Sequence, residues 1–452
     1  MKVLLVNPWQ GRLVSGRGRV YNRAWTPLDL ATTAAVLRGR GIEAAILDAN
    51  ALRLGPAEAG ARCAGFDRVF VTSTSLDRWQ CPHLDLAPFL ETVAAAKAAA
   101  PEVYVMGSHG TVLPAEMLAL TGARAVVRGE PEGIVPALAA GAPLAEVLGI
   151  TWSRGGETIH NADAPPVRLD DLPAPAFDLL PLERYSYEVM GGRFVLLEMS
   201  RGCASECNFC LLKTYGDGVR RKSVPRLAAE IEAACALGAR TAYFIDLEFT
   251  VLRKQVLELC DWLIEKNLDF EWCCQTRLDL VDDELLERMR RAKCTLIHFG
   301  VEAGSDVALA TLNKGITMAA IREGMRKVKK AGIRTATFFM FGFPESTERD
   351  MDDVEAFARE LAPDYPLFHV VAPYPGTALH DRVKSDPALR FSDDTLFPEA
   401  VEAALTLADL KRLTRRAYLR YYLRPGYLLG RLAAPAGLAA QLRLFWSFVT
   451  AR

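Results

Sequence analysis

The sequence has almost no net charge, no long apolar run and few features of an exported protein. Its 54 Lys and Arg balance 55 Asp and Glu, so nothing in the composition favours a nucleic-acid partner. The most apolar stretch begins at Tyr418 and is interrupted by Arg420, Arg424 and further arginines, so we expect no stable membrane insertion. The apolar run Val3–Val6 is too short for a signal peptide. We therefore expect a cytoplasmic, globular protein.

The ten cysteines are the most informative residues of the chain. Without an export signal we expect reduced thiols, which favour metal binding or redox chemistry over a disulfide framework. Cys203, Cys207 and Cys210 share one short segment, and three thiolates in one loop can bind three irons of a cubane cluster while the fourth iron stays open for a chelating ligand. A structural zinc site would need a fourth Cys or His at motif spacing, and none follows nearby. The remaining cysteines are scattered and are expected in the core.

Short apolar runs alternate with amphipathic segments through the first 140 residues, in the order typical of a parallel sheet with crossover helices. The expected strands are Val3–Val6, Glu43–Leu47, Arg68–Thr72, Val103–Met106 and Arg124–Val127, and the expected helices include Leu28–Arg38 and Leu86–Ala99. We therefore predict an α/β fold that starts with a doubly wound domain over 1–140. Because ligands of such sheets bind at the carboxyl ends of the strands, we expect binding loops at Asn7–Pro8, Thr72–Ser75 and Gly107–Gly110.

A proline-rich segment, 141–190, separates this domain from a second alternation and is interpreted as a linker. The second set of expected strands is Phe194–Met199, Thr241–Ile245, Phe270–Gln275, Leu296–Gly300, Thr335–Phe341 and Phe368–Val371, with helices such as Val224–Ala236, Val256–Lys266, Asp283–Arg291 and Ala319–Lys330 between them. Six such units predict a partial or full barrel over 191–385 with its chemistry at the carboxyl ends of the strands. The remainder, 386–452, is expected to be a small helical cap with an arginine-rich amphipathic end.

The cysteine segment resembles the signature of the radical S-adenosylmethionine (SAM) superfamily, in which an aromatic residue, here Phe209, precedes the last cysteine. The resemblance implies a four-iron four-sulfur ([4Fe-4S]) cluster on Cys203, Cys207 and Cys210, with the amino and carboxylate groups of SAM on the unique iron. One electron from an external flavodoxin-like or ferredoxin-like donor would cleave SAM to methionine and a 5′-deoxyadenosyl radical, which abstracts hydrogen from a substrate.

Acidic and basic residues at later strand ends match further positions of this superfamily. Asp246 and Glu248 follow the second strand, where an acidic residue contacts the SAM amino group, and either of them fits that position. Arg277, after the third strand, is placed to pair with the SAM carboxylate through its fork of donors. Glu302, after the fourth, is placed to accept from the SAM hydroxyls or amine. Each alone is as often a helix cap or a surface ion pair, but their order beside the cysteine loop favours a common site.

The segment after the fifth strand, which includes Gly342 and Pro344, resembles the part of these enzymes that lines the adenine site. Tyr374–Thr377, after the sixth strand, matches another recurrent motif of the same branch.

The first domain resembles the cobalamin-binding half of the class B radical SAM enzymes, a group that includes the anaerobic porphyrin cyclases. The matching segments are Asn7–Pro8, Thr26–Ala31, Gly107–His109, Arg128–Glu132 and, in the linker, Leu172–Pro181. The resemblance implies cobalamin binding, with candidate contacts from Asn7, Thr72, Ser73, Ser75, Gly107, Ser108, His109 and Glu130. A cobalamin-free doubly wound domain is the alternative, because fold alone does not identify a ligand.

The motif Asp-x-His-x-x-Gly, with which some cobalamin proteins donate a histidine to cobalt, is absent from the sequence, so we expect no histidine below the metal. His109 is instead a candidate for a bond to a corrin amide or to the nucleotide tail. The hydroxyls of Thr72, Ser73 and Ser75 suit phosphate or corrin contacts, and suit turn capping equally well. Arg78, Trp79 and His83 follow shortly and are candidates for the lower face of cobalt.

The resemblance implies a cobalamin-dependent radical SAM methyltransferase that moves a methyl group from SAM via methylcobalamin to an unactivated carbon, or less favourably to phosphorus. The substrate would be a small molecule, such as a tetrapyrrole or a natural-product intermediate. A cyclase, ring-contracting or oxidative enzyme with the same cofactors but without methyl transfer is the alternative. A non-catalytic cobalamin or metal sensor is disfavoured by the intact cysteine loop. The C-terminal segment either covers the barrel mouth, which we favour, or lies on a membrane. The oligomeric state is not predicted.

Overall fold

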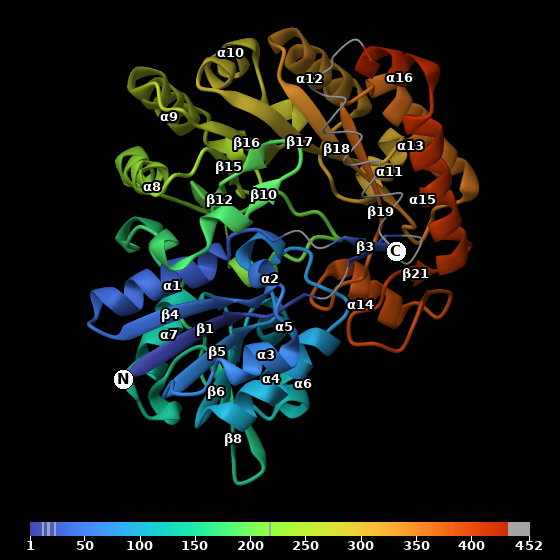
Figure 1. Cartoon of the computed structure of the whole chain (residues 1–452). Coiled ribbons are helices and arrows are strands. Elements are labelled where there is room, and N and C mark those ends of the chain that lie inside the picture. The colour runs from blue at the N-terminus through green and yellow to red at the C-terminus, as the bar shows by residue number, and fades with distance from the viewer. Residues whose placement is uncertain (11–12, 16–18, 22–23, 217, 433–452) are drawn as a thin grey trace.

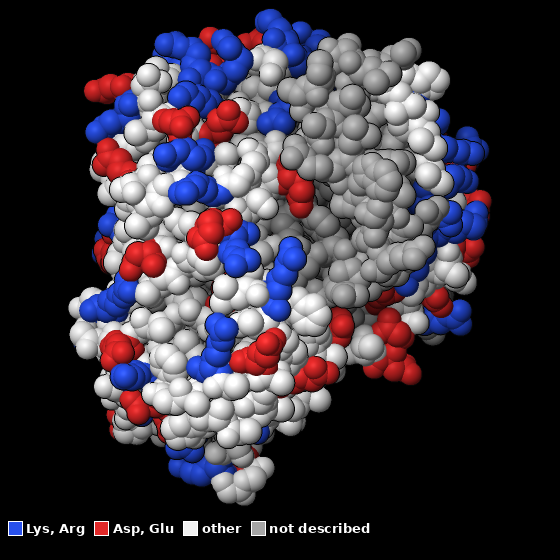
Figure 2. Space-filling model, in the orientation of Figure 1, with Lys and Arg blue, Asp and Glu red and all other residues white. Residues whose placement is uncertain are grey.

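The computed structural model describes residues 1–10, 13–15, 19–21, 24–216 and 218–432. The blue and cyan part of the chain forms one layered domain, and the green to orange part forms a second body beside it (Figure 1). Among the helices in these ranges, none is long and apolar enough to cross a membrane. Positive and negative side chains are interspersed over the face shown in Figure 2.

The first sheet has seven strands in the order β4-β1-β5-β6-β7-β8-β9. The strands are β1 (Lys2–Asn7), β4 (Glu43–Asp48), β5 (Arg68–Thr72), β6 (Glu102–Met106), β7 (Ala125–Val127), β8 (Ile150–Arg154) and β9 (Glu157–His160). The first five strands are parallel, with β1 between β4 and β5, so that the strand order reverses at β1. This is the predicted doubly wound arrangement, and the crevice at the reversal lies outside the ends of β1 and β5.

Alternating side chains of these strands face two separate cores. Val3 and Leu5 pack with α1 (Leu28–Gly39) and α7 (Pro131–Ala140) on one face. Leu4 and Val6 face the other side of the sheet. That side is covered by α3 (Pro56–Ala61), α4 (Ala87–Ala99) and α6 (Pro114–Thr121). Helices on both faces explain why the strand sequences are apolar throughout.

The segment 141–190 holds more than turns. β8 pairs antiparallel with β7, and β9 pairs antiparallel with β8, so the first sheet extends beyond residue 140. The rest of the segment contains short 3₁₀ helices and the small antiparallel pair β10 (Ser186–Tyr187) and β11 (Gly191–Gly192). The domain boundaries drawn from the sequence stay a prediction. The hairpin β8-β9 is an addition to the first sheet that lies within the predicted linker.

The second sheet has six parallel strands in the order β12-β15-β16-β17-β18-β19. They are β12 (Phe194–Leu197), β15 (Thr241–Phe244), β16 (Glu271–Thr276), β17 (Cys294–Glu302), β18 (Arg334–Phe341) and β19 (Tyr365–Val370). Helices α8 (Val224–Ala236), α9 (Arg253–Lys266), α10 (Asp283–Arg291), α12 (Met318–Ala331) and α13 (Glu348–Leu361) connect them along the outside. Since β12 and β19 stand at the two ends of the strand order, this is the predicted partial barrel.

The C-terminal part begins with a short strand pair, β20 (Arg390–Phe391) and β21 (Val401–Glu402), so helix starts only at α15 (Leu407–Tyr422) and continues in α16 (Pro425–Leu432). α15 packs against α13 and β19. The Phe368 amide of β19 donates to the Tyr418 hydroxyl over 3.0 Å, and the Tyr422 hydroxyl donates to the Pro366 carbonyl. The helix thus covers the edge strand of the barrel, which would otherwise offer unpaired backbone groups. Residues 433–452 of the expected cap lie outside the described range.

Besides the two cores of the first sheet, a third hydrophobic core, which fills the barrel, extends across the interface between the two domains. Leu28 and Trp79 of the first domain belong to the cluster that fills the barrel. The ring of Trp25 lies 5.6 Å from that of Phe194 and 5.5 Å from that of Tyr243. The Leu196 amide of β12 donates to Thr26 Oγ1 over 2.7 Å. Because this interface is apolar and interdigitated, the loops at the strand ends of both sheets are held in a fixed relation.

Candidate active site at the domain interface

The cysteine loop leaves the barrel through a short antiparallel pair, β13 (Ser200–Gly202) and β14 (Val219–Arg221). Gly202 has φ +102°, and a Cβ there would lie 2.0 Å from the Gly218 carbonyl oxygen, so only glycine fits at this crossing. Asp246, at the end of β15, accepts hydrogen bonds from the Met199 amide and from both the amide and the hydroxyl of Ser200. Burial raises the pKa of Asp246 to about 6. Both carboxylate oxygens are committed to the start of the loop, so the structure gives Asp246 a positioning role.

The three signature cysteines are free thiols, each partly exposed. Burial raises the pKa of Cys203 to about 11, with Glu248 adding to the effect. Burial also raises the pKa of Cys207, while the charges of Lys314 and Arg277 oppose that rise. Within the described ranges, no three His, Cys, Asp or Glu side chains converge around the position of a single ion. Each thiol nevertheless influences the pKa of another, so they lie near one another, as ligands of different irons in one cluster require.

Glu248 and Arg277 both bind the loop between the first two cysteines. Glu248 accepts from the Ala204 amide over 3.3 Å and from the Ser205 hydroxyl. Arg277 donates to Ser205 Oγ over 3.0 Å and to the Lys314 carbonyl over 2.6 Å. The structure therefore brings together these two predicted SAM contacts, one from the end of β16 and one from the end of β15, around Ser205.

Glu302 has the most unusual environment of the predicted residues. It ends β17 with φ +68°, a left-handed conformation that is costly for a residue with a side chain. Its Oε1 lies 3.0 Å from the ammonium of Lys314. Its Oε2 is buried and has no hydrogen-bond partner among the residues that the structure describes. A strained backbone and an unsatisfied buried carboxylate oxygen, together at a strand end, fit a residue that awaits a ligand.

Sequence reasoning missed Lys314. This buried cation follows α11 (Asp306–Thr311) in the loop Asn313–Gly315, and its charge opposes the rise that burial causes in the pKa of Cys207. Gly300 makes room for the pair, because a Cβ there would lie 2.3 Å from Glu302 Oε1 and 2.7 Å from Lys314 Nζ. The only sequence signal was a lone Lys before a Gly, which is too common to single out.

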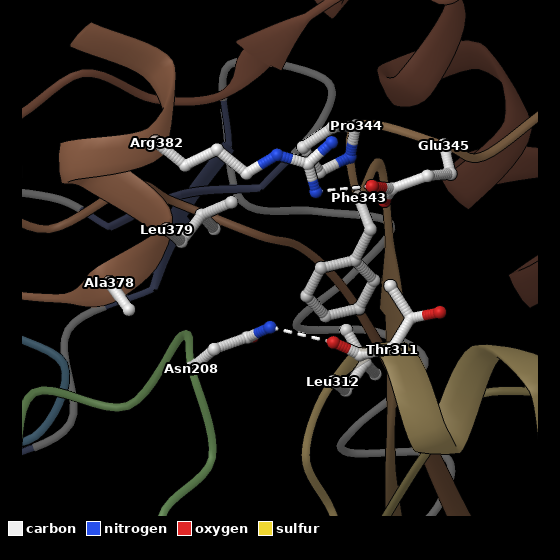
Figure 3. A pocket seen from close by; sticks show the side chains of 9 residues that line it. All are labelled: Asn208, Thr311, Leu312, Phe343, Pro344, Glu345, Ala378, Leu379 and Arg382. Carbon is white, nitrogen blue, oxygen red and sulfur yellow. Dashed lines mark hydrogen bonds and ion pairs between the residues drawn. The ribbon is translucent and has the colours of Figure 1, made fainter. Parts of the chain in front are cut away.

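A cavity of about 130 Å³ lies beside the cysteine loop. Figure 3 shows its lining, namely Asn208, Thr311, Leu312, Phe343, Pro344, Glu345, Ala378, Leu379 and Arg382. Asn208 donates to the Thr311 carbonyl over 2.8 Å, while its Oδ1 is buried without a partner in the described part of the chain. The Phe209 and Phe343 rings meet edge to face at 5.5 Å. Pro344 thus lies beside the cluster loop as expected for an adenine-lining segment, and Gly342 takes the φ of +91° that lets the chain turn there.

Several of the predicted cobalamin contacts in the first domain hydrogen-bond to other residues of the loops that carry them. Thr72 Oγ1 donates to the Thr74 carbonyl over 2.7 Å, and Ser108 Oγ donates to the Trp79 carbonyl over 3.2 Å. A Cβ on Gly107 would lie 2.7 Å from Ser73 Oγ, so the two loops touch. The Ser75 hydroxyl donates a hydrogen bond to Asp77 Oδ1 over 2.6 Å. These residues shape the loops at the carboxyl ends of β5 and β6.

His109 has no ring nitrogen left for a corrin. Its Nδ1 lies 3.0 Å from Thr74 Oγ1 and its Nε2 lies 2.8 Å from the His83 carbonyl oxygen. Burial lowers the pKa of His109 to about 4, so the ring is neutral at ordinary pH. The expected bond from His109 to a corrin amide is therefore replaced by a bond that joins two loops.

Glu130 likewise has other partners. Its carboxylate accepts from Arg201 and Arg220 of the pair β13-β14 and from the Val167 amide. Although burial acts in the other direction, these two guanidinium groups lower the pKa of Glu130. The contacts place Glu130 at the domain interface, next to the cysteine loop, and do not support a direct corrin contact.

Three buried polar atoms remain without partners at the ends of β1 and β5, counting only described residues. They are Asn7 Oδ1, Arg78 Nε and Trp79 Nε1. The other end of the Asn7 amide donates to Asp48 over 2.9 Å, which fixes the orientation of Asn7. Unsatisfied donors and acceptors at the topological switch point of a doubly wound sheet fit a polar ligand such as a corrin with amide side chains.

Comparisons with known proteins agree with this geometry. Residues 197–358 match the radical SAM superfamily. An uncharacterized methyltransferase of Pyrococcus horikoshii is 29% identical over 443 residues, which cover 95% of this chain and 94% of that protein. The anaerobic magnesium-protoporphyrin IX monomethyl ester cyclase of Cereibacter sphaeroides is 27% identical over 310 residues, 64% of this chain and 51% of the cyclase. The chain therefore spans about half the length of that cyclase.

Among solved structures, the radical S-adenosylmethionine methyltransferase TsrM from Kitasatospora setae, with cobalamin and a [4Fe-4S] cluster bound, is similar with a TM-score of 0.70 and 18% identity. The alignment covers 92% of this chain and 81% of TsrM. The second domain of the chain is thus a radical SAM domain behind a doubly wound domain. Residues 197–358 thus match the radical SAM superfamily, and over most of its length the chain is similar in sequence to a protein named a methyltransferase and in fold to a radical SAM methyltransferase solved with cobalamin.

Proposed function

We propose that the protein is a cobalamin-dependent radical SAM methyltransferase, which moves a methyl group from SAM to an unactivated carbon, or less favourably to phosphorus, of a small-molecule substrate. The observation that carries the proposal is a loop with three free thiols, Cys203, Cys207 and Cys210, fastened between a partial barrel and a doubly wound domain. When bound, the [4Fe-4S] cluster supplies the electron that cleaves SAM, and cobalamin carries the methyl group. The methyltransferase names of the Pyrococcus and Kitasatospora proteins support the same reaction class.

The overall reaction balances with two molecules of SAM and two electrons. One SAM gives up its methyl group and leaves as S-adenosylhomocysteine. The other takes up one electron and yields methionine and, after removing a hydrogen atom from the substrate, 5′-deoxyadenosine. The second electron balances the charge of the methyl group, which leaves SAM as a methyl cation. An external donor of the flavodoxin or ferredoxin kind would supply both electrons.

The barrel residues would hold SAM at the open iron of the cluster. Glu302 Oε2, which lacks a partner among the described residues, would accept from the SAM amine or a ribose hydroxyl. Lys314 would face the SAM carboxylate. The guanidinium fork of Arg277 is taken by Asp279, so Arg277 and Glu248 would instead keep the cysteine loop in place through Ser205. Pro344 and its cavity would take the adenine ring. Because Glu248, Glu302 and Lys314 are themselves buried, a ligand held by them would be largely shielded from water.

The first domain would hold the corrin at the ends of β1, β5 and β6. Asn7, Arg78 and Trp79 offer the unsatisfied atoms, and Gly107 lets the β5 and β6 loops close on each other. Thr72, Ser75 and Ser108 would shape this surface, because their hydroxyls bond to Thr74, Asp77 and Trp79 of the neighbouring loop, and Ser73 lies against Gly107. We place the reaction in the cytoplasm, because all ten cysteines are free thiols and because the reaction needs a low-potential electron donor.

Anaerobic reconstitution with iron, sulfide and hydroxocobalamin tests this assignment. After desalting, we expect about one [4Fe-4S] cluster and one cobalt per chain. With methyl-labelled SAM and titanium(III) citrate, the label should move to a substrate supplied from an anaerobic cell extract. Transfer of label supports methyl transfer, whereas 5′-deoxyadenosine without any labelled product favours a cyclase or oxidative reaction. Iron without cobalt would contradict the cobalamin assignment.

A further inference from the structure

One carboxylate of the first domain holds both strands that enclose the cysteine loop. Arg201 of β13 and Arg220 of β14 are cross-strand partners. The guanidinium of Arg201 donates to Glu130 Oε1 over 2.8 Å, and that of Arg220 donates to the same oxygen over 2.6 Å and to Oε2 over 3.0 Å. Two like charges side by side would repel, and Glu130, which accepts from both guanidinium groups, offsets that repulsion.

Arg201 is fully buried and surrounded by acidic residues from both domains. It donates to Glu132 over 3.0 Å and to Glu198 over 2.7 Å, in addition to Glu130. Its guanidinium also lies over the ring of Trp79, 5.7 Å from the ring centre. Glu130 and Glu132 both lie at the start of α7, whereas Glu198 follows β12, so this arginine joins the two domains.

The far part of the cysteine loop touches the first domain as well. The Tyr215 hydroxyl donates to Gln80 Oε1 over 2.7 Å, and the Tyr215 ring lies 5.6 Å from that of Trp79. Thr214 Oγ1 lies 3.5 Å from the Trp79 carbonyl oxygen. The segment 76–81, which carries the unsatisfied atoms of Arg78 and Trp79, is therefore in direct contact with the loop that carries the cysteines.

Buried ion pairs of this kind contribute little to stability compared with apolar packing, but they define one geometry, since each charge must meet its partner. A contact that only stabilised the fold would not require one carboxylate to accept hydrogen bonds from both β13 and β14. We propose that Glu130 and Arg201 are positioning residues that fix the cysteine loop relative to the corrin-facing segment 76–81. The inference rests on the proposed function and deepens it. It distinguishes two reactions of SAM: methyl transfer to cobalamin, which crosses the domain interface, and reductive cleavage, which takes place on the barrel.

The loss of the methyl group from SAM to reduced cobalamin crosses the interface and leaves S-adenosylhomocysteine. The reductive cleavage of SAM stays on the barrel and leaves methionine and 5′-deoxyadenosine. Both products would form in the reconstituted protein with SAM and titanium(III) citrate as the only additions, so the test does not require a known substrate. Weakening the contact should therefore lower the ratio of S-adenosylhomocysteine to 5′-deoxyadenosine.

The test compares Glu130→Gln with Glu102→Gln. Glu102 lies in the same domain and pairs with Arg68 over 2.6 Å, but takes no part in the interface contacts of Arg201. In reconstituted Glu130→Gln we expect the product ratio to fall about tenfold, because a small displacement of reacting groups costs that much or more. The rate of 5′-deoxyadenosine formation should stay within about twofold of the unmodified protein. Glu102→Gln should match the unmodified protein in both.

A second measurement needs no turnover. The electron-spin signal of cob(II)alamin saturates at higher microwave power when a nearby reduced cluster speeds its relaxation, and this effect falls steeply with distance. In Glu130→Gln the reduced cluster should speed relaxation less than in the unmodified protein. If Glu130→Gln does not retain iron and cobalt, Arg220→Gln carries the same test, because the Arg220 side chain is 21% exposed and its replacement disturbs the core less.

Unchanged product ratio and unchanged relaxation in cobalt-loaded Glu130→Gln or Arg220→Gln would overturn the positioning role and leave the proposed function intact. An unmodified protein that takes up iron but no cobalt would contradict the proposed function itself, and this inference with it.

Discussion

The Lys314 ammonium lies 3.0 Å from one carboxylate oxygen of Glu302, and the other oxygen has no partner within the described residues. The pair sits at the end of β17, near Cys207, whose pKa is raised by burial while the charge of the lysine opposes that rise. A buried salt bridge normally leaves no hydrogen-bonding atom of either charged group without a partner. Here it orients the carboxylate and leaves one acceptor open, so Glu302 is ready for a donor from a ligand without further movement.

Glu302→Gln should therefore weaken SAM binding. The amide keeps the shape of the side chain but loses the charge that attracts the SAM amine, and a hydrogen bond to a charged group contributes about 1.5–3 kcal/mol. We expect the Kd of SAM for the cluster-loaded protein to rise about tenfold to a hundredfold, measured by equilibrium dialysis. Glu323→Gln, which removes an exposed ion pair with Arg326 on α12, is the control and should leave the Kd unchanged.

Gly300→Ala should disturb the same pair without removing a charge. The new Cβ would lie 2.3 Å from Glu302 Oε1 and 2.7 Å from Lys314 Nζ, closer than real contacts allow. We expect SAM binding to weaken by about tenfold or more, with a loss of about 1–3 kcal/mol in the free energy of unfolding. Gly192→Ala is the matched control, since a Cβ at Gly192 meets nothing within 4 Å. Equal Kd values for the two variants would show that the pair does not hold SAM.

Cys207→Ala should abolish reductive cleavage of SAM, because the three thiolates together complete the ligand set of the cluster. Cys235, partly exposed on α8, gives the control Cys235→Ala, which should retain iron and activity. Iron content, the visible spectrum and 5′-deoxyadenosine formation are the measurements. A Cys207→Ala protein that still forms 5′-deoxyadenosine at the unmodified rate would refute the cluster assignment.

Much of the fold could be predicted because its elements are strongly patterned. Val224–Ala236 and Asp283–Arg291 are helices with the expected bounds, and the barrel strands were found within a few residues. Helical amphipathicity and continuous apolar strands are local signals. The hairpin β8-β9 was missed, since the largely exposed β9 lacks an apolar run and is ordered by pairing with a neighbouring strand.

The site was harder to predict because its contacts join distant residues. The cysteines could be found from spacing alone, whereas the partner of Glu130 is Arg201, 71 positions away in the other domain. His109 was expected at a ligand because it follows a strand, but its two ring nitrogens meet Thr74 and His83. Sequence placed these residues at the correct edge of the sheet, and only tertiary packing decides which of them keep a free polar atom.

The neutral state of His109 leads to a prediction about pH. Because burial lowers its pKa to about 4, the ring is neutral in the folded protein while an unfolded chain would protonate it below about pH 6.5. The histidine therefore costs stability as pH falls from about 6.5 towards 4, and it does not titrate above that range. We expect the amount of methylcobalamin retained after gel filtration to be constant between pH 6 and 8. A fall near pH 6.5 that disappears in His109→Gln would instead identify His109 as a titrating contact. His160→Gln, on the exposed strand β9, is the control.

Asp29 provides a pH test of the domain interface that needs no cofactor. It lies in the first turn of α1, fully buried, with Oδ1 lacking a partner among described residues. Burial, together with the charges of Glu132 and Asp77, raises its pKa to about 8. The folded protein thus binds a proton that the unfolded chain releases near pH 4, so this group makes the protein less stable as pH rises from about 4 to 8.

The variant Asp29→Asn tests this, because it keeps the shape of the side chain and cannot ionise. We expect its free energy of unfolding, relative to the unmodified apo-protein, to be higher by about 4 kcal/mol at pH 8.5 than at pH 5, measured by urea denaturation. The exposed Asp67→Asn should show no such difference between the two pH values. If Asp29→Asn and Asp67→Asn behave alike, Asp29 is ionised in the folded protein and its charge is met by a group at the interface.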